Sequence, residues 1–194
     1  MLGVLIELQR LKRLDRTGWV LRGLPPGAES VAAHSYGVAL AAMLLADECA
    51  ARGARVDAER VLRLALLHDL AETRTGDMPR TVADYYGPGE RKRAERAAFD
   101  DVMRGGLGAG RAARYSGLHE DYEERTSVEA RIVKAADVID LLAQALAFER
   151  AGARGLGEFW EGASERDFGL EGACRDVVAE AIAALVAARR EGDE

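Results

Sequence analysis

Apolar residues recur at steps of three and four along most of the 194-residue chain. Spacing of this kind places apolar side chains on one face of a helix, so it predicts amphipathic α-helices. No stretch alternates apolar and polar residues with a period of two, so we expect no strands. The pattern therefore predicts an all-α fold, with helices at residues 2–14, 31–52, 57–73, 90–104, 110–124, 127–151 and 171–190.

Turn-forming residues separate the predicted helices. The connecting stretches carry glycine or proline, as in LPPGAES at 24–30 and GGLGAG at 105–110. Ser30 and Asp57 each stand directly before a periodic run, which is where N-cap residues belong. Because the length suits one domain and no internal repeat is present, we expect a single domain over residues 1–194.

Composition narrows the class of protein. Apolar residues make up 48% and charged residues 31% of the chain, the balance of a soluble globular protein. The formal net charge of −6 offers no basic footprint for duplex nucleic acid, so we expect no nucleic-acid partner. The longest apolar run, at residues 38–46, is about half a membrane span, so we expect no membrane partner. Cys49 and Cys174 without a CxxC spacing indicate a reducing compartment and a cytoplasmic protein.

One predicted helix carries ionisable side chains on its buried face. In the segment ALLHDLAETRTGDMP, His68 lies three and four residues beyond Ala65 and Leu64, on the apolar side of the helix. Glu72 lies four residues further along the same side, whereas Asp69 is about 100° around the helix from His68. A histidine with carboxylates at the inward end of a helix points to a binding site.

Two further ionisable residues lie on the apolar stripes of other predicted helices. His34 shares a helix face with Val38, and Asp137 shares one with Val133. Two histidines and two aspartates from three helices therefore point inward. Burying carboxylates is costly, and a divalent cation removes that cost because it neutralises the carboxylates and binds imidazole nitrogen. Nitrogen and oxygen ligands suit Mn, Fe, Co, Ni or Zn without selecting one of them.

A simpler interpretation stays open on these residues alone. A histidine on an apolar helix face is commonly a hydrogen-bonded core residue, and a buried aspartate commonly pairs with arginine or caps a backbone. The metal site is favoured by the conjunction of two inward histidines and two inward aspartates, with two further carboxylates flanking one histidine: His34, His68, Asp69 and Asp137, with Glu72 and Asp77.

The order of these residues resembles the H…HD…D signature of the HD-domain metal-dependent phosphohydrolases. The resemblance runs from about Leu11 to Phe159 and implies an HD-domain helical bundle. Its metal-binding core would cover about residues 30–150, followed by a C-terminal helix at about 171–190. Within that superfamily the chain is most similar to the YfbR-like 5′-deoxynucleotidases and their eukaryotic relatives, on the segments ESVAAHSYGVALAAMLLAD, ALLHDLAETRTGDMP and EARIVKAADVIDLLAQALAFE.

The resemblance implies hydrolysis of deoxyribonucleoside 5′-monophosphates to deoxynucleoside and phosphate. It also implies one divalent cation (Co, Mn, Mg, Fe, Ni or Zn), a small-molecule nucleoside monophosphate as substrate, and a homodimer. The catalytic carboxylates would be Glu72 and Asp77, near the attacking water and the phosphate; which of them is the acid stays open. The ligands of the metal ion would be His34, His68, Asp69 and Asp137.

The segment LKRLDRTGWVLRG resembles the N-terminal substrate-recognition stretch of the family. Arg16 would face the phosphate or the sugar, and Trp19 resembles the tryptophan of the eukaryotic members. In bacterial members a tryptophan directly follows the arginine, where this chain has Thr17, so which side chain controls the sugar 2′ position stays open. Lys134 is a further candidate for substrate binding, and a solvent-facing role for it is an equal alternative.

Two other residues bear on how tightly the site binds metal and on how many ions it holds. Ala33 stands where the family usually has an acidic residue, so a partner of the ligand shell is expected to be missing. His119 lies in a polar helix end and is interpreted as a surface residue, which leaves too few histidines for a second metal. Two alternatives remain: an HD phosphohydrolase of shifted specificity (ribonucleotide, other nucleoside phosphate or cyclic-nucleotide phosphodiester), or a non-catalytic nucleotide-binding regulator.

Overall fold

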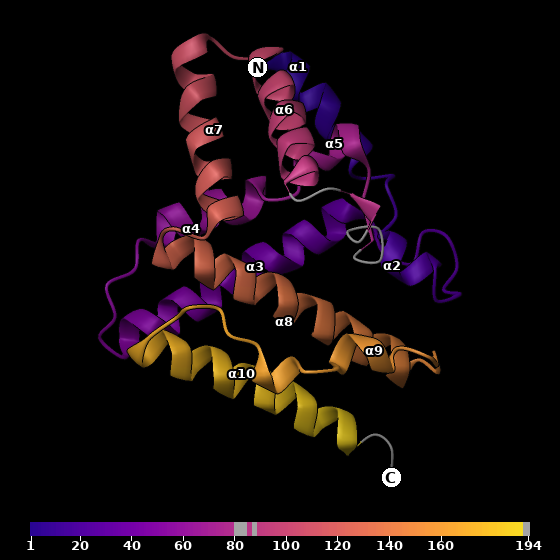
Figure 1. Cartoon of the computed structure of the whole chain (residues 1–194). Coiled ribbons are helices and arrows are strands. Elements are labelled where there is room, and N and C mark those ends of the chain that lie inside the picture. Colours follow the sequence, from indigo (N-terminus) through magenta and orange to yellow (C-terminus); the bar gives the residue numbers. More distant parts are fainter. Residues whose placement is uncertain (80–84, 87–88, 192–194) are drawn as a thin grey trace. The chain divides into compact units, whose positions relative to one another are not determined.

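The computed structural model describes residues 1–79, 85–86 and 89–191, and Figure 1 shows their course. Within these residues the regular structure is helical, apart from one antiparallel bridge between Asp15 and Ser30. The prediction of an all-α fold is confirmed. No helix in the described part of the chain combines the length and the apolar character that crossing a membrane requires.

The helices differ widely in length, and short 3-10 turns, labelled η, connect some of them. In chain order they are α1 (Leu2–Glu7), η1 (Leu8–Arg10), α2 (Thr17–Val20), α3 (Val31–Ala51), α4 (Ala58–Leu67), α5 (Glu72–Thr75), α6 (Glu90–Arg104), α7 (Ala109–Glu124), α8 (Val128–Arg150), α9 (Gly157–Trp160), η3 (Ala163–Glu165) and α10 (Gly172–Arg190).

Most of the long helices end within one residue of their predicted bounds. The predicted helix at 57–73 is wrong as a continuous helix, because α4 ends at Leu67 and α5 begins only at Glu72. The predicted helix at 2–14 is wrong at its C-terminal end, where the chain leaves the helical path after η1. Helices α2, α9 and η3 were not predicted, since three or four residues are too few to show a helical period.

Both predicted N-caps are confirmed. The Ser30 hydroxyl accepts a hydrogen bond from the backbone N–H of Ala33, at 3.1 Å, and so begins α3. The Asp57 carboxylate accepts one from the N–H of Arg60, at 3.0 Å, and begins α4. Each side chain satisfies a backbone donor that has no partner within its own helix.

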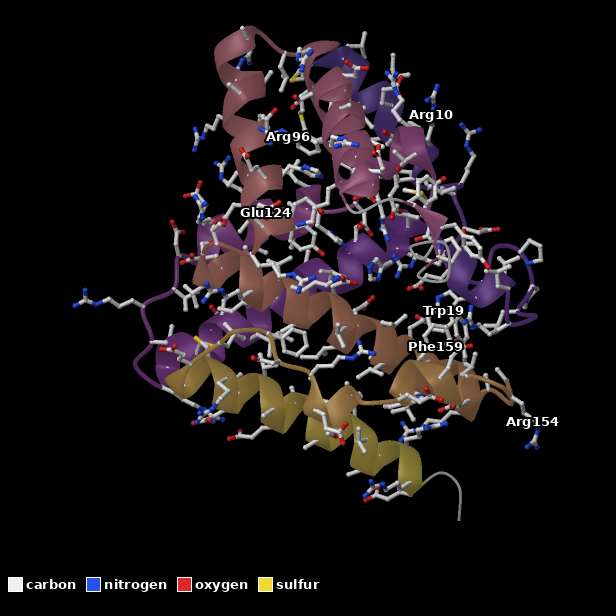
Figure 2. The ribbon with its side chains drawn as sticks, viewed as in Figure 1. Arg10, Trp19, Arg96, Glu124, Arg154 and Phe159 are labelled. Carbon is white, nitrogen blue, oxygen red and sulfur yellow. The ribbon has the colours of Figure 1, made fainter. Side chains whose placement is uncertain are left out.

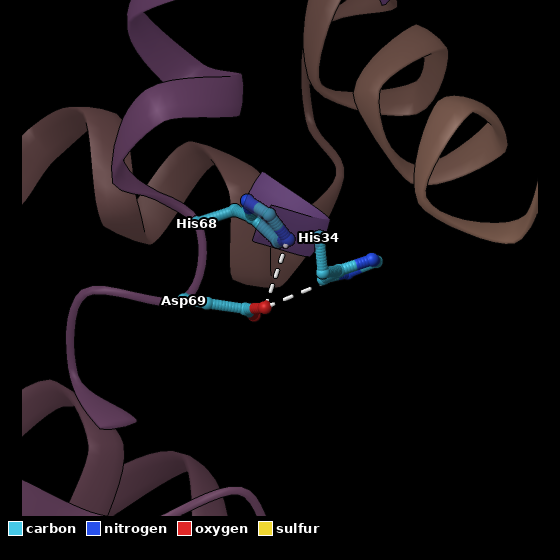
Figure 3. A group of neighbouring side chains, drawn as sticks. All are labelled: His34, His68 and Asp69. Atoms are coloured by element: carbon cyan, nitrogen blue, oxygen red, sulfur yellow. Dashed lines mark ion pairs between the residues drawn. The ribbon is translucent and has the colours of Figure 1, made fainter. Parts of the chain in front are cut away.

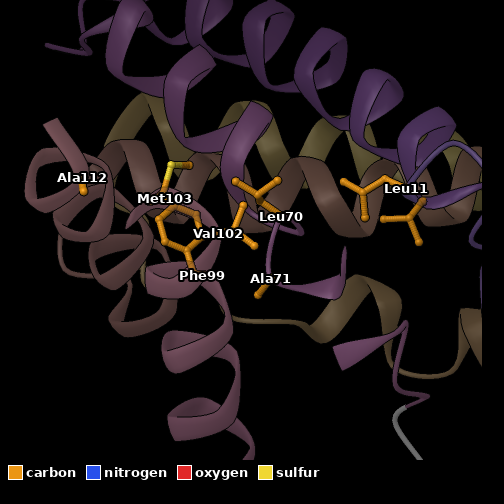
Figure 4. Close-up of a cluster of buried hydrophobic side chains, with 8 residues drawn as sticks. Leu11, Leu70, Ala71, Phe99, Val102, Met103 and Ala112 are labelled. Carbon is orange, nitrogen blue, oxygen red and sulfur yellow. The ribbon is translucent and has the colours of Figure 1, made fainter. Parts of the chain in front are cut away.

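The chain divides into two compact units, and α3 begins in one and continues in the other. The first unit comprises Met1–Tyr36 and Leu66–Glu124. In it α6 and α7 pack together, and Arg96 of α6 (Figure 2) forms an ion pair with Glu120 of α7, at 2.8 Å. Figure 4 shows the buried apolar cluster of this unit: Leu11, Val31, Leu70, Ala71, Phe99, Val102, Met103 and Ala112.

The second unit comprises Gly37–Ala65 and Arg125–Glu194. Helices α3 and α8 approach closely at Gly37, where a Cβ atom would collide with the carboxylate of Asp140. On α10, Arg189 forms a 2.9 Å ion pair with Glu149 of α8. The predicted extent of the single domain, residues 1–194, stays a prediction.

Candidate active site

Three side chains of the first unit converge on one point. Nε2 of His68 and Nε2 of His34 lie 3.1 and 3.6 Å from the same carboxylate oxygen, Oδ2 of Asp69. The two imidazole rings meet edge to face, with centroids 5.5 Å apart. Figure 3 shows both ion pairs meeting at the Asp69 carboxylate. Ligand atoms from all three residues lie within 4.8 Å of one another, close enough to bind a single ion.

A turn, and not a helix, presents His68 and Asp69. Helix α4 ends one residue earlier, and the N–H of Leu70 donates to the carbonyl of Leu67, at 3.1 Å. The N–H of Glu72 likewise donates to the carbonyl of Asp69, at 3.0 Å, so bonds of this i to i+3 spacing connect α4 to α5. The predicted helix is therefore interrupted at the two neighbouring residues whose side chains meet at Oδ2 of Asp69.

The donor set of this cluster fits a divalent cation. Both histidines are buried, and burial alone would raise the pKa of the Asp69 carboxyl. His68, then His34 and Arg16, instead hold that pKa well below its usual value, so the carboxyl is ionised. Two imidazole nitrogens and one carboxylate oxygen are ligands for a first-row divalent metal, whose identity they do not determine.

Glu72 lies at the start of α5, one turn beyond the cluster. Its side chain is buried, and its Oε2 has no hydrogen-bond partner among the residues that the structure describes. Burial, followed by the charges of Asp69 and Asp77, raises the pKa of Glu72 to about 10, against the opposing effect of Arg16. The Glu72 carboxyl therefore holds a proton at neutral pH in the metal-free protein.

Arg16 lies between two carboxylates. Its Nη1 is 3.5 Å from Oδ2 of Asp69 and 3.5 Å from Oδ1 of Asp77. The other Asp77 oxygen, Oδ2, accepts the backbone N–H of Thr17, at 2.5 Å. The structure thus places Arg16, a predicted substrate-binding residue, and Asp77, a predicted catalytic residue, next to the cluster of His34, His68 and Asp69.

Gly76 makes the turn that connects Glu72 to Asp77. Its φ of 76° and ψ of 163° lie in a region that is essentially restricted to glycine and costs other residues about 1–3 kcal/mol. We expect Gly76→Ala to lower the free energy of unfolding by that amount in urea denaturation. Gly117→Ala is the matched control, because Gly117 is an exposed glycine inside α7 with space for a methyl group. Equal stabilities of the two variants would contradict the prediction.

Trp19, the candidate for contact with the sugar, is enclosed in this conformation. The residue lies on α2 (Figure 2), is 1% exposed, and donates its indole N–H to Oε2 of Glu29. The role of Trp19 at the substrate stays a prediction. Glu29 was not predicted as a site residue, although its place directly before the N-cap Ser30 and near His34 in the sequence was a usable signal.

The remaining predicted site residues lie on α8, in the second unit. Nζ of Lys134 lies 2.6 Å from Oδ2 of Asp137, and both side chains are partly buried. The ion pair supplies the carboxylate with a positive partner. The assignment of Asp137 as a metal ligand and of Lys134 as a substrate contact stays a prediction.

The interpretation of His119 as a surface residue was wrong. The side chain is buried, and its ring stacks on that of Phe99 with centroids 4.2 Å apart. One turn further along α7, the ring of Tyr122 lies edge to face against His68, at 5.4 Å. Helix α7 therefore supplies part of the wall behind the cluster, and the spacing of His119 and Tyr122 was the missed sequence signal.

Acid should destabilise the protein through His119. Burial lowers the pKa of His119 to about 4; Arg96 and His68 also lower it, while Asp100 and Asp69 oppose this. Because the unfolded chain binds this proton more readily, stability is lost as pH falls from about 6.5 to 4.

We therefore expect about 2 kcal/mol of the stability lost between pH 7.5 and pH 5 to come from this residue. Urea denaturation of wild type and His119→Gln at both pH values measures it, because the variant should lose less stability on acidification. Equal losses in the two proteins would contradict the prediction.

Comparison with known proteins identifies the family of the chain. The family model described as HD domain matches residues 8–165. The 5′-deoxynucleotidase HDDC2 of Danio rerio is 36% identical over 140 residues, which are 72% of this chain and 65% of that protein. The match therefore spans slightly less than two thirds of that relative.

Two further relatives cover more of their own length. The 5′-deoxynucleotidase hdd1 of Schizosaccharomyces pombe is 30% identical over 161 residues, or 80% of this chain and 77% of that protein. The solved structure of a conserved hypothetical protein from Pyrococcus furiosus is 34% identical, with a TM-score of 0.82, and covers 96% of this chain and 99% of its own. The chain belongs to the HD domain family, as its motifs predict, and its relatives there include proteins named 5′-deoxynucleotidases.

Proposed function

We propose that this protein is a metal-dependent 5′-deoxynucleotidase. The reaction would convert a deoxyribonucleoside 5′-monophosphate and water into a deoxynucleoside and phosphate. The observation that carries the proposal is the convergence of His34 and His68 on Asp69, with Arg16 against the same carboxylate. The activity named for the relatives from Danio rerio and Schizosaccharomyces pombe supports the choice of substrate.

The proposed metal site holds one divalent cation (Co, Mn, Mg, Fe, Ni or Zn). Its ligands would be His34, His68 and Asp69, with Asp137 as the fourth. When bound, such an ion compensates phosphate charge and lowers the pKa of water, which makes a nucleophile available at neutral pH. The ionised state of Asp69 supports this assignment, since a metal ligand must be deprotonated.

The side chains around the cluster would bind the substrate, donate a proton and orient the attacking water. Arg16 would bind the phosphate, because a guanidinium matches phosphate oxygens with two parallel hydrogen bonds. Glu72, which holds a proton, would donate it to the 5′ oxygen as the phosphorus–oxygen bond breaks. Asp77 would orient the attacking water or Arg16. Trp19 and Lys134 remain the proposed contacts to the sugar and the phosphate.

We also propose a cellular location and an oligomeric state for the enzyme. Cys49 and Cys174 are both buried and not disulfide-bonded, which is consistent with the reducing environment of a cytoplasmic protein. We also propose that the protein acts as a homodimer and uses no nucleic-acid or membrane partner.

One observation favours a second function, an HD phosphohydrolase of shifted specificity. Trp19 is 1% exposed and its indole N–H is used by Glu29, so this side chain does not meet a sugar in the present conformation. If no other group excludes the 2′ hydroxyl, ribonucleotides would also be hydrolysed. A non-catalytic regulator is less favoured, because both carboxylates of the proposed chemistry, Glu72 and Asp77, are retained.

A comparison of deoxyribonucleotides with the matching ribonucleotides distinguishes the three candidate functions. Metal-stripped protein would receive Mn, Co, Mg or Zn singly, and each deoxyribonucleotide would be tested beside its ribonucleotide, with phosphate release as the readout. We expect release from the deoxyribonucleoside monophosphates alone. Release from both sugars would support shifted specificity. No release with any metal would overturn the proposed activity and favour the regulator.

A further inference from the structure

Thr17 contacts Asp77 through two hydrogen bonds. Its backbone N–H donates to Oδ2 of the carboxylate, at 2.5 Å, and its hydroxyl donates to the main-chain carbonyl of the same residue, at 2.8 Å. One bond orients the Asp77 side chain and the other fixes the backbone from which it projects. The two residues are 60 positions apart in the sequence, so the contact joins two separate segments of the first unit.

The same contact determines how Asp77 lies relative to Arg16. Arg16 directly precedes Thr17, and its Nη1 lies 3.5 Å from the Asp77 oxygen that Thr17 does not contact. Nη1 also lies 3.5 Å from Oδ2 of Asp69, the oxygen that faces both histidines. An arginine side chain has many rotamers, whereas a β-branched threonine has few, so Thr17 is the stiffer of the two links.

The segment that carries Arg16 and Thr17 is itself fastened to the chain entering α3. The N–H of Arg16 donates to the carbonyl of Glu29, at 3.0 Å, and the N–H of Val31 donates to the carbonyl of Leu14, at 2.8 Å. His34 follows on the first turn of that helix. Thr17 therefore connects this segment, which is hydrogen-bonded to the chain entering α3, to the turn that carries Asp77.

We infer that Thr17 is a positioning residue for the proposed reaction, which holds the Asp77 carboxylate in register with Arg16. The inference rests on the proposed function. Thr17 acts through Asp77 and touches neither substrate nor metal in this role. A catalytic group displaced by about 1 Å can lose about a hundredfold in rate, so a residue that fixes position has a measurable effect on turnover.

Three variants test the inference. Thr17→Val keeps the shape and the N–H but removes the hydroxyl, and Thr17→Ser restores the hydroxyl. Thr73→Val is the matched control, because the Thr73 hydroxyl also donates to a main-chain carbonyl, that of Leu70 at 2.9 Å, and does not contact Asp77; Thr73 is buried and Thr17 is partly buried. We expect kcat to fall about tenfold in Thr17→Val with KM changed less than about twofold, recovery to within about threefold in Thr17→Ser, and no change in Thr73→Val.

Hydrogen exchange of the metal-free protein supplies a readout that does not depend on activity. Amides of residues 76–78 should exchange about fivefold faster in Thr17→Val, as expected for one lost hydrogen bond, and at the wild-type rate in Thr73→Val. A lower Tm with unchanged kcat and exchange would overturn the inference. If wild type releases no phosphate, the proposed function fails, while unchanged exchange in Thr17→Val would separately reject the positioning of Asp77.

Discussion

Replacing Asp69 with alanine should abolish both metal binding and phosphate release. Asp69 is the group on which His34 and His68 converge, and Arg16 contacts the same oxygen. Without the carboxylate two imidazoles alone would have to hold the ion. Loss of a catalytic metal removes several kcal/mol of transition-state stabilisation, so we expect turnover to fall at least about a thousandfold.

Metal content after dialysis and phosphate release measure this effect. Asp101→Ala is the matched control, since Asp101 is an exposed aspartate of α6. If the two histidines were only hydrogen-bonded core residues, the Asp69 variant would lose about 1–3 kcal/mol of stability and keep any activity. Full metal occupancy in Asp69→Ala would contradict the metal site.

Replacing Glu72 with glutamine should lower kcat strongly and, at pH 8, raise the stability of the metal-free protein. Burial, Asp69, Asp77 and Glu95 all raise the pKa of this carboxyl, to about 10. The glutamine keeps the shape but cannot donate the proton. General acid catalysis contributes about 10²- to 10⁴-fold, so we expect kcat to fall within that range with little change in KM.

The stability effect of Glu72→Gln has a defined pH dependence. Because the pKa of Glu72 is raised to about 10 from its ordinary 4.5, the folded state binds this proton more tightly than the unfolded chain. The contribution of this bound proton to the free energy of unfolding is therefore complete below pH 4.5 and is lost as pH rises from 4.5 through 10.

Thermal unfolding of metal-free wild type and Glu72→Gln at pH 4 and pH 8 measures it. We expect similar Tm values at pH 4. At pH 8 the variant should be more stable by roughly 5 kcal/mol, or about 10–20 °C in Tm. Glu161→Gln, at an exposed position directly after α9, should change neither kcat nor Tm. A Tm of Glu72→Gln below that of wild type at pH 8 would contradict a protonated, buried Glu72.

Much of the fold could be predicted because long amphipathic helices carry their own signal. Helices α6, α8 and α10 end close to the predicted bounds, since each has three turns or more of periodic apolar residues. The caps Ser30 and Asp57 were equally visible, because a cap is a local interaction between neighbours in the sequence. Short helices such as α2 depend on tertiary contacts and left no such pattern.

The sequence predicted which residues belong to the site better than it predicted how they are arranged. Helical counting placed His68 on a buried face, and the residue is buried, but it stands on a turn beyond α4. Periodicity cannot detect this turn because Leu70 and Ala71 continue the apolar pattern and pack into the core. His119 was missed for the opposite reason: charged neighbours obscured an inward face that stacks on Phe99.

The hydrogen bonds that orient Asp77 and Trp19 could not be predicted from the sequence. Thr17 and Glu29 act on residues 60 and 10 positions away, through hydrogen bonds that no local pattern encodes. Their partners, Asp77 and Trp19, were predicted as catalytic and substrate-binding residues. What sequence could not supply was the network that orients them.

The central claim is that one divalent cation, held at His34, His68 and Asp69, is required for hydrolysis of a deoxyribonucleoside 5′-monophosphate. The most direct test adds a metal stepwise to metal-stripped protein and follows both bound metal per chain and phosphate release from one such substrate. We predict that release rises with occupancy and reaches its plateau at one ion per chain. Undiminished release from stripped protein in the presence of a chelator, or a plateau only at two ions per chain, would contradict the claim.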